Sequence, residues 1–335
     1  MVDVSVLMCV FNTSAHMLKD SIKSVLSQDY KNIELVIVDD ASTNIDTLKV
    51  LDKVRDNNRV VIIKNVENKG LTKSLNIGLA KCRGKYVARL DSDDMAYPNR
   101  IAIEKKFLDK YTNYDIVCSY ATYIGRKPKN FHKHVNYMSN PEKFNLKMLF
   151  MNVGPIHSTV MIRKKFLENN SVEYDERFYR SQDYKLWLDC LACGAKFAWL
   201  QTESTIYRFH NKQISYTDSN DQERDKKKII VENLERNLHI DNKSACIMSS
   251  IYSEKYEYPI QEYISAISIC REKNRNIKKY DIKLFEKEMR IRWIHKVIKC
   301  FIKGKDARGL LRLQTLYDFV NGGFWGLIME KIAYR

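Results

Sequence analysis

Short runs of β-branched residues alternate with helical patterns through the first third of the chain. Apolar runs typical of strands occur at 4–10, 33–38, 59–64, 85–90 and 115–120, and apolar faces at helical spacing occur at 15–27, 71–82 and 99–111. Nearly continuous apolar strands that alternate with helices are typical of a mostly parallel sheet covered on both faces. In such sheets ligands bind beyond the carboxyl ends of the strands. We therefore search for chemistry in the residues that follow each strand.

The pattern loosens after residue 130. A strand-like segment at 158–162, a helix at 182–193 and a strand at 195–200 follow, and from about 226 the patterning is helical. This predicts a first domain at 1–225 and a helical, basic carboxyl-terminal region at 226–335. We divide the first domain into two halves, 1–120 and 121–225.

Composition excludes disordered and repetitive proteins. The chain has 335 residues, of which 44% are hydrophobic, 11% aromatic and 29% charged, and its formal net charge is +16. A chain of this kind has enough apolar surface for a core. The amino terminus has no basic segment before its first apolar run, and no apolar run is long enough to span a bilayer. We therefore expect a cytosolic protein.

The positive charge is concentrated near the carboxyl end. Residues 271–312 contain 15 Lys and Arg against five Asp and Glu. At helical spacing they form an apolar stripe (Ile291, Ile294, Ile298, Phe301) and a basic stripe (Arg292, Lys296, Lys299, Lys303). Two interpretations stay open. The helix lies on an anionic membrane surface, or it packs on the rest of the protein with a solvated basic face.

The sharpest chemical signal is an acidic cluster after the strand at 85–90. Asp91, Asp93 and Asp94 repel one another and are tolerated best when a cation neutralises them. Asp91 and Asp93 point the same way in extended backbone. Carboxylates suit Mg²⁺ or Mn²⁺, whose coordination shell is often completed by substrate phosphates. The cluster therefore predicts a divalent-metal site for a nucleoside diphosphate.

A second acidic pair, Asp39 and Asp40, follows the strand at 33–38. A carboxylate there can accept a hydrogen bond from a uracil imide or from ribose hydroxyls. The alternative is a cap for a helix that begins near Ser42 or Thr43. Lys69 precedes the helix at 71–82 and adds a cation near a helix amino terminus, which favours anions.

Seven segments in this order resemble family 2 glycosyltransferases, inverting enzymes of the GT-A fold. The segments are Val10-Phe-Asn12, Val38-Asp-Asp-Ala-Ser42, Asn68-Lys-Gly70 with Asn76, Leu90-Asp-Ser-Asp-Asp94, Gly154-Pro-Ile-His-Ser-Thr-Val-Met-Ile-Arg163, Arg180-Ser-Gln-Asp-Tyr-Lys-Leu-Trp187 and Tyr207-Arg-Phe-His210. They span about residues 4 to 215. Cys9 and Phe11 stand where the family often has proline and tyrosine, and Gln182 replaces a common glutamate.

The resemblance implies roles for individual residues. Asp39 would contact uracil or ribose, Asp91 the ribose, and Asp93 a metal that bridges the phosphates, while Asp94 positions its neighbours. It also places Phe11, Asn12, Lys69, Arg89 and Ser92 with the nucleotide sugar.

The same resemblance makes Asp183 the base that accepts the proton of the acceptor hydroxyl. The alternative is a carboxylate that stabilises a helix amino terminus. His210 would help to hold the metal or the diphosphate, or it is a structural residue. Arg208 is a diphosphate clamp or a surface residue. His157, Gln182 and Trp187 are placed on the acceptor side, although Trp187 also fits a helix core.

We therefore expect an inverting glycosyltransferase that uses Mn²⁺ or Mg²⁺. It would transfer a hexose or an N-acetylhexosamine from a UDP-sugar to a glycan or undecaprenyl-diphosphate-linked acceptor and form a β-linkage. Such enzymes build surface polysaccharides such as O-antigen, capsule or lipooligosaccharide.

Three alternatives remain. A phosphatase normally has its D-x-D motif at the end of the first strand, and a nucleotidylyltransferase has a glycine-rich loop near its start, which Val10-Phe-Asn-Thr-Ser14 lacks. A nucleic-acid-binding protein would explain the +16 charge, but no such motif appears and aspartates at the strand ends repel phosphate. We expect no nucleic-acid partner.

Overall fold

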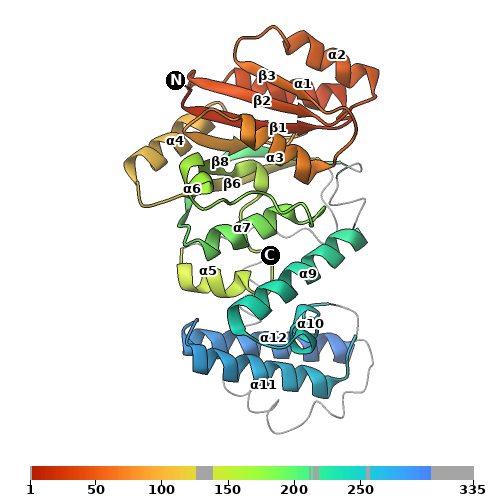
Figure 1. Cartoon of the computed structure of the whole chain (residues 1–335), viewed down its shortest axis with the longest axis vertical. Coiled ribbons are helices and arrows are strands. Elements are labelled where there is room, and N and C mark those ends of the chain that lie inside the picture. The colour runs from red at the N-terminus through yellow and green to blue at the C-terminus, as the bar shows by residue number, and fades with distance from the viewer. Residues whose placement is uncertain (1, 126–138, 211–212, 214–218, 254–256, 303–335) are drawn as a thin grey trace. The chain divides into compact units, whose positions relative to one another are not determined.

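The computed structural model of the chain describes residues 2–125, 139–210, 213, 219–253 and 257–302 (Figure 1). The side chains of 219–220 and 298–302 lie outside this description. The chain forms two compact units, one of residues 1–139 and 154–222 and the other of residues 140–153 and 223–335. The segment 140–153 thus belongs to the second unit, although it lies within the range 1–225.

The first unit is built on a mixed sheet in the order β3-β2-β1-β4-β7-β6-β8-β5 (Figure 1). The strands are β1 (Val4–Val10), β2 (Ile33–Asp39), β3 (Val60–Lys64), β4 (Tyr86–Arg89), β5 (Met95–Ala96), β6 (Ile116–Gly125), β7 (Met161–Arg163) and β8 (Phe197–Phe209). The pairs β2–β3, β1–β2 and β1–β4 are parallel. Strand β7 pairs antiparallel with β4 and β6, whereas β6 and β8 are parallel. The parallel half therefore brings the ends of β1, β2 and β4 to one edge.

Helices cover both faces of this sheet. The helices of the unit are α1 (Ala15–Leu26), α2 (Ile45–Val54), α3 (Leu71–Lys81), α4 (Arg100–Lys110), α6 (Lys164–Asn169) and α7 (Gln182–Ala192). One face of β1, with Val6 and Met8, shares a buried cluster with Leu18 of α1. The opposite face packs on α3, where a Cβ at Gly78 would lie 2.3 Å from Leu7 Cδ1. Alternate β1 residues thus serve two cores, which explains why every residue of the strand except Ser5 is apolar.

The predicted α/β class is confirmed, but one strand prediction was wrong. Residues His157–Thr159 form a 3-10 turn, and the strand begins only at Met161. The turn is closed by the Thr159 amide, which donates to the Ile156 carbonyl at 2.9 Å. The strand-like run Thr159, Val160, Met161 and Ile162, in which all but Met161 are β-branched, concealed this turn.

The second unit is helical over its described residues. Its helices are α5 (Pro141–Met148), α10 (Asn242–Ser249), α11 (Ile260–Ile277) and α12 (Ile282–Ile302), together with most of α9 (Ser219–Leu238). Phe150 and Phe285 pack together in it with their ring centroids 6.4 Å apart. Where the structure describes the chain, none of its helices has both the length and the apolar composition needed to cross a bilayer.

The basic stripe predicted on α12 is wrong for two of its four members. Arg292 is completely buried and Lys296 is 2% exposed. The Arg292 guanidinium lies over the Phe150 ring and pairs with Glu288 at 2.6 Å. The Lys296 ammonium donates to the Ser250 carbonyl at 3.2 Å. These two residues belong to the core of the second unit, because their long stems reach buried partners.

The other six residues of the two stripes fall into two groups. Ile291 and Ile294 are buried as predicted for an apolar stripe. Ile298, Phe301, Lys299 and Lys303 lie outside the described side chains. The membrane interpretation of this face therefore loses the two cations that the structure describes.

Candidate active site

Arg89 and Asp91 form the centre of the carboxyl edge of the sheet. The buried Arg89 guanidinium pairs with Asp91 Oδ1 and also donates to the Leu7 carbonyl at 3.3 Å. Ser158 Oγ donates to Asp91 Oδ2 at 2.7 Å. Burial alone would raise the pKa of Asp91, but the Arg89 charge and the Ser158 hydrogen bond hold it below its ordinary value. Asp91 is therefore a fixed, ionised carboxylate.

Hydroxyl groups orient the backbone around Asp91. Ser21 Oγ of α1 donates to the Asp91 carbonyl at 3.1 Å, and the oxygens of Thr13 and Ser92 lie 2.7 Å apart. The first of these contacts ties α1 to the loop after β4, and the second ties in the loop after β1. Ser92 thus helps to shape the predicted nucleotide site.

Asp93 lies against His210, which follows the end of β8. His210 Nε2 and Asp93 Oδ2 are 2.7 Å apart, and both side chains are about one-fifth exposed, at 22% and 21%. The structure thus brings together the two residues that sequence reasoning assigned to a metal. Among the described residues there is no group of three or more His, Cys, Asp or Glu side chains placed to hold a metal ion.

Arg208 holds the acidic loop in place. Its Nε donates to the Asp93 carbonyl at 2.9 Å, and its backbone amide donates to Asp94 Oδ1 at 2.9 Å. Its guanidinium also pairs with Asp20 of α1 at 3.3 Å. Arg208 is therefore not a free surface residue, and Asp94 positions its neighbours through contacts within the protein. Burial and the nearby carboxylates raise the pKa of Asp94 well above its ordinary range.

Asp39 and Asn12 build the loop after β2. Asp39 Oδ1 accepts from the Ser42 amide at 3.0 Å, and Asn12 Oδ1 accepts from the Thr43 and Asn44 amides at 2.8 Å each. Helix α2 begins only at Ile45 and is capped by Asn44, so Asp39 is not its cap. Beside this loop the Phe11 side chain is 52% exposed. An exposed aromatic ring next to a buried carboxylate is a suitable setting for a nucleobase.

Asp40 fixes the loop that precedes α3. Its Oδ1 accepts from the Lys69 amide and its Oδ2 from the Gly70 amide, both at 2.8 Å. Asn65 Nδ2 donates to the same Oδ1 at 2.7 Å. The Lys69 backbone is thereby held while its side chain stays exposed. Asp40 is a structural residue that sequence reasoning treated only as the neighbour of Asp39.

Asp183 lies in the first turn of α7, two residues after Ser181, whose φ of 56° is left-handed. One carboxylate oxygen, Oδ1, accepts from the Tyr184 amide at 2.7 Å. Gln182 beside it is 9% exposed. Burial raises the pKa of Tyr174, the Arg89 charge opposes this shift, and the Asp183 charge adds to it. Asp183 thus lies close enough to Tyr174 for its charge to act on the Tyr174 hydroxyl.

The segment before α7 is fastened to α3. Asn76 exchanges two hydrogen bonds with the backbone of Tyr174, at 2.8 and 2.9 Å, and Thr72 Oγ1 donates to the Phe178 carbonyl at 2.9 Å. Gly70 has a φ of 83°, and a Cβ there would lie 2.3 Å from the Tyr179 ring. The nucleotide-side loop and the segment that leads to Asp183 are thus in direct contact.

Two acceptor-side predictions need correction. Trp187 is completely buried and packs against His157 and Phe197, so it cannot contact an acceptor. His157 is 8% exposed, and its Nε2 lies 2.7 Å from the Tyr174 hydroxyl. Burial and the Arg89 charge lower the pKa of His157 to about 3. His157 is a neutral supporting residue behind Asp91.

Several residues of this centre had no usable signal in the sequence. Ser158, Tyr174 and Thr72 contact the site only because the fold joins segments 67 to 106 residues apart. Ser158 and Asp20 are ordinary polar residues in their local context. The family resemblance included the segment around His157, but it did not single out Ser158 as the residue that reaches Asp91.

The fold and these motifs have counterparts among known proteins. Residues 5–170 match the model of the glycosyl transferase family 2. An uncharacterized glycosyltransferase of Haemophilus influenzae is 30% identical over 335 residues, which cover 90% of this chain and 96% of that protein. This chain belongs to glycosyltransferase family 2.

Other relatives of this glycosyltransferase are more informative. Escherichia coli WfaP, a UDP-Glc:alpha-D-GlcNAc-diphosphoundecaprenol beta-1,3-glucosyltransferase, is 31% identical over 212 residues, covering 63% of this chain and 79% of WfaP. The crystal structure of a Staphylococcus aureus TarS fragment with UDP-GlcNAc superposes with a TM-score of 0.60 at 17% identity, covering 91% of this chain and 93% of that one. The glycosyltransferase thus has the GT-A fold.

Proposed function

We propose that this glycosyltransferase transfers a hexose or an N-acetylhexosamine from a UDP-sugar to a lipid-linked glycan acceptor in surface-polysaccharide synthesis, with inversion and with a divalent metal. The observation that carries this proposal is the meeting of Asp93 with His210 beside the fixed Asp91. WfaP supports a UDP-sugar donor and a diphosphoundecaprenol-linked acceptor. A lipid-linked acceptor supports action at the inner face of the cytoplasmic membrane.

The nucleotide would lie across the ends of β1 and β2. In this proposal Asp39 accepts from the uracil or ribose, Phe11 covers the base, and Asp91 accepts from the ribose hydroxyls. Asn12 and Ser92 shape the surrounding loops, and Lys69 adds a positive charge to them. Because Asn12 and Asp40 already hold these loops through backbone amides, donor binding requires little reordering of the backbone.

Asp93 and His210 would hold Mn²⁺ or Mg²⁺. Carboxylate oxygens suit both ions, and such ions leave coordination positions open for substrate phosphates. The bound ion supplies Lewis-acid stabilisation of the departing diphosphate. Arg208 keeps the Asp93 backbone in position through its carbonyl.

Asp183 would act as the base. The acceptor hydroxyl oxygen bonds to the anomeric carbon, the bond from that carbon to the diphosphate oxygen breaks, and the hydroxyl proton passes to the Asp183 carboxylate while UDP leaves. Attack on the face opposite the diphosphate gives the β-linkage from an α-linked donor. The helix amino terminus favours the ionised carboxylate that is needed before attack.

The test is a panel of UDP-sugars assayed for UDP release with Mn²⁺, Mg²⁺ or EDTA, using a short-chain diphosphate-lipid sugar as acceptor. We expect one donor to be used, EDTA to abolish turnover, and Asp183→Asn to lower kcat by about 10²–10⁴-fold while UDP binding is kept. Asp52→Asn, which changes an exposed carboxylate on α2, is the matched control. If no UDP-sugar binds under any of these conditions, the proposal is wrong.

A further inference from the structure

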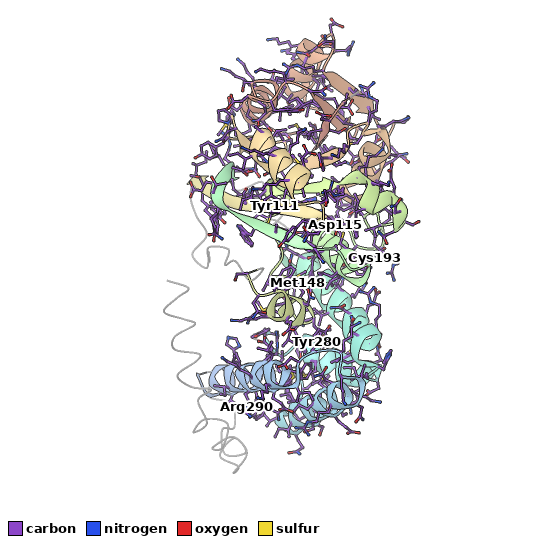
Figure 2. All side chains as sticks on the ribbon, turned by 90° about the vertical axis from the view of Figure 1, so that its left-hand side faces the viewer. Tyr111, Asp115, Met148, Cys193, Tyr280 and Arg290 are labelled. Atoms are coloured by element: carbon purple, nitrogen blue, oxygen red, sulfur yellow. The ribbon has the colours of Figure 1, made fainter. Side chains whose placement is uncertain are left out.

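The turn between α11 and α12 displays two isoleucines to solvent. Ile277 is 38% and Ile282 is 41% exposed, and they are the only large hydrophobic side chains exposed in the described part of the second unit. Ile277 is the last residue of α11 and Ile282 the first of α12. The turn can be followed in Figure 2 from the label of Tyr280. The two isoleucines lie at the two ends of one short turn, so the turn presents two apolar side chains to solvent rather than one.

The backbone between the two exposed isoleucines is held by side-chain hydrogen bonds. The side chain of buried Asn274 exchanges two hydrogen bonds with the backbone of Tyr280, each at 3.0 Å. Tyr280 packs on Phe285 with ring centroids 6.1 Å apart. Tyr280 therefore fills the core position of this turn, and Ile277 and Ile282 lie outside the core.

Lysines surround the two isoleucines. Lys278, Lys279 and Lys283 are exposed in the same turn, and Lys287 is exposed one helical turn further on. Residues 277–283 carry the first three of these lysines and one acidic residue, Asp281, whose Oδ1 caps α12 by accepting from the Leu284 amide at 2.8 Å. Of the neighbouring acidic residues, Glu286 pairs with Arg271 and Arg275, and Glu272 is exposed on α11. The turn thus combines an apolar tip with a surplus of positive charge.

We propose that the turn of residues 277–283 docks the glycosyltransferase on an anionic lipid surface, with Ile277 and Ile282 entering the headgroup region and Lys278, Lys279 and Lys283 binding anionic headgroups. Apolar residues flanked by lysines are the combination that such interfaces recognise. This surface differs from the buried Arg292 and Lys296. The inference rests on the proposed function only in that a lipid-linked acceptor gives the docking a purpose.

The test is co-sedimentation of the full chain with phosphatidylcholine vesicles that contain or lack phosphatidylglycerol. We expect the wild type to bind the anionic vesicles and to be released by salt. Lys278→Gln/Lys279→Gln/Lys283→Gln should weaken partitioning by on the order of a hundredfold. Ile277→Ser/Ile282→Ser should also weaken it, by roughly tenfold or more, through lost apolar burial.

Two control variants carry comparable changes on α2 of the first unit. Ile45→Ser replaces an isoleucine that is 69% exposed, and Lys49→Gln/Lys53→Gln replaces two exposed lysines. Both controls should bind vesicles like the wild type. Equal binding by turn variants and wild type overturns the inference, as does binding that is unchanged when phosphatidylglycerol is left out.

Two further readouts distinguish lipid docking from nucleic-acid binding and from a loss of catalysis. If the lysine variant loses retention on single-stranded RNA but keeps vesicle binding, the turn is a nucleic-acid surface and the inference is wrong. UDP release with a water-soluble acceptor should be unchanged in the turn variants. Absence of vesicle binding with normal UDP release rejects only the docking surface, whereas vesicle binding without any turnover of a UDP-sugar rejects only the proposed function.

Discussion

Asp93 Oδ2 and His210 Nε2 lie 2.7 Å apart, although 117 residues separate them in the chain. Strand β8 produces this contact. It pairs antiparallel with β5, which follows the acidic loop, and its Arg208 binds the Asp93 carbonyl two residues before His210. In the proposed function these two side chains hold the metal, and they come from two different segments of the chain. Either side chain can therefore be replaced without a change in the segment that carries the other.

Replacing His210 by alanine should weaken the response to metal. In the proposed function His210 is one of two protein ligands of the metal, so its loss should raise the Mn²⁺ concentration for half-maximal UDP release by about tenfold or more. A Mn²⁺ titration of UDP release measures this, with thermal unfolding as a check on folding. His16→Ala, which changes an exposed histidine, is the control. An unchanged Mn²⁺ requirement in His210→Ala would mean that the histidine has only a structural role.

Gly70→Ala should be more damaging than Gly194→Ala. Both glycines have positive φ, 83° and 80°, so both substitutions introduce backbone strain of about 1–2 kcal/mol. Of these two positions, only Gly70 has a neighbour within reach of the new Cβ, the half-exposed Tyr179 ring, whereas nothing lies within 4 Å at Gly194. The Tyr179 ring must shift, which should add to the loss in free energy of unfolding at Gly70 only.

Urea unfolding of the two glycine variants measures the difference. Because Gly70 and Tyr179 join the nucleotide loop to the segment before Asp183, Gly70→Ala should also lower kcat. Equal losses of stability in the two variants would contradict the contact between Gly70 and Tyr179.

His157 should make the protein less stable as the pH falls. Burial lowers its pKa from 6.5 to about 3 in the folded state, so below 6.5 the unfolded chain binds a proton that the folded chain does not. Its contribution is therefore complete above pH 6.5 and is lost progressively as the pH falls toward 3, by at most about 1.4 kcal/mol per pH unit.

His157→Gln should flatten that dependence. The free energy of unfolding, measured in urea between about pH 7 and pH 5, should fall less steeply in this variant than in the wild type. His16→Gln is again the control and should retain the wild-type slope. Parallel curves for wild type and His157→Gln would show that the histidine is not held neutral.

Glu288→Ala should destabilise the second unit strongly. Glu288 is 4% exposed and pairs with Arg292 at 2.6 Å and Lys147 at 3.5 Å, so its removal leaves two buried cations without their carboxylate. Breaking a buried pair in this way costs about 3–5 kcal/mol. Glu262→Ala removes the partner of an exposed lysine, Lys243, and should change stability by less than about 1 kcal/mol. Chemical denaturation of both variants tests the difference.

The parallel half of the sheet could be predicted because its strands are apolar on both faces and are spaced by amphipathic helices. Strand β5 (Met95–Ala96) has only two residues and was missed, since no periodicity can be read from so short a segment. Strand β8 extends to Phe209, beyond the predicted 195–200, because its polar outer half is held by pairing with β6. Tertiary pairing, not local pattern, sets these bounds.

The candidate site shows the same division between local and long-range information. Asp39 is the last residue of β2, and Asp91 and Asp93 come within four residues of the end of β4, so pattern reasoning found them. The supporting residues Ser158 and Asn76 could not be found in this way, because a serine or an asparagine acquires its function only from a partner brought close by the fold. The prediction that Arg292 and Lys296 form a basic surface stripe was wrong, because helical periodicity does not distinguish a solvated cation from a buried one.

The two hydrogen bonds between Asn76 and Tyr174 have a consequence for engineering. They attach the segment that leads to Asp183 to α3, and α3 itself packs closely on β1 at Gly78. Substitutions made elsewhere to change the choice of sugar should therefore leave the position of Asp183 unchanged, provided that these two hydrogen bonds are kept.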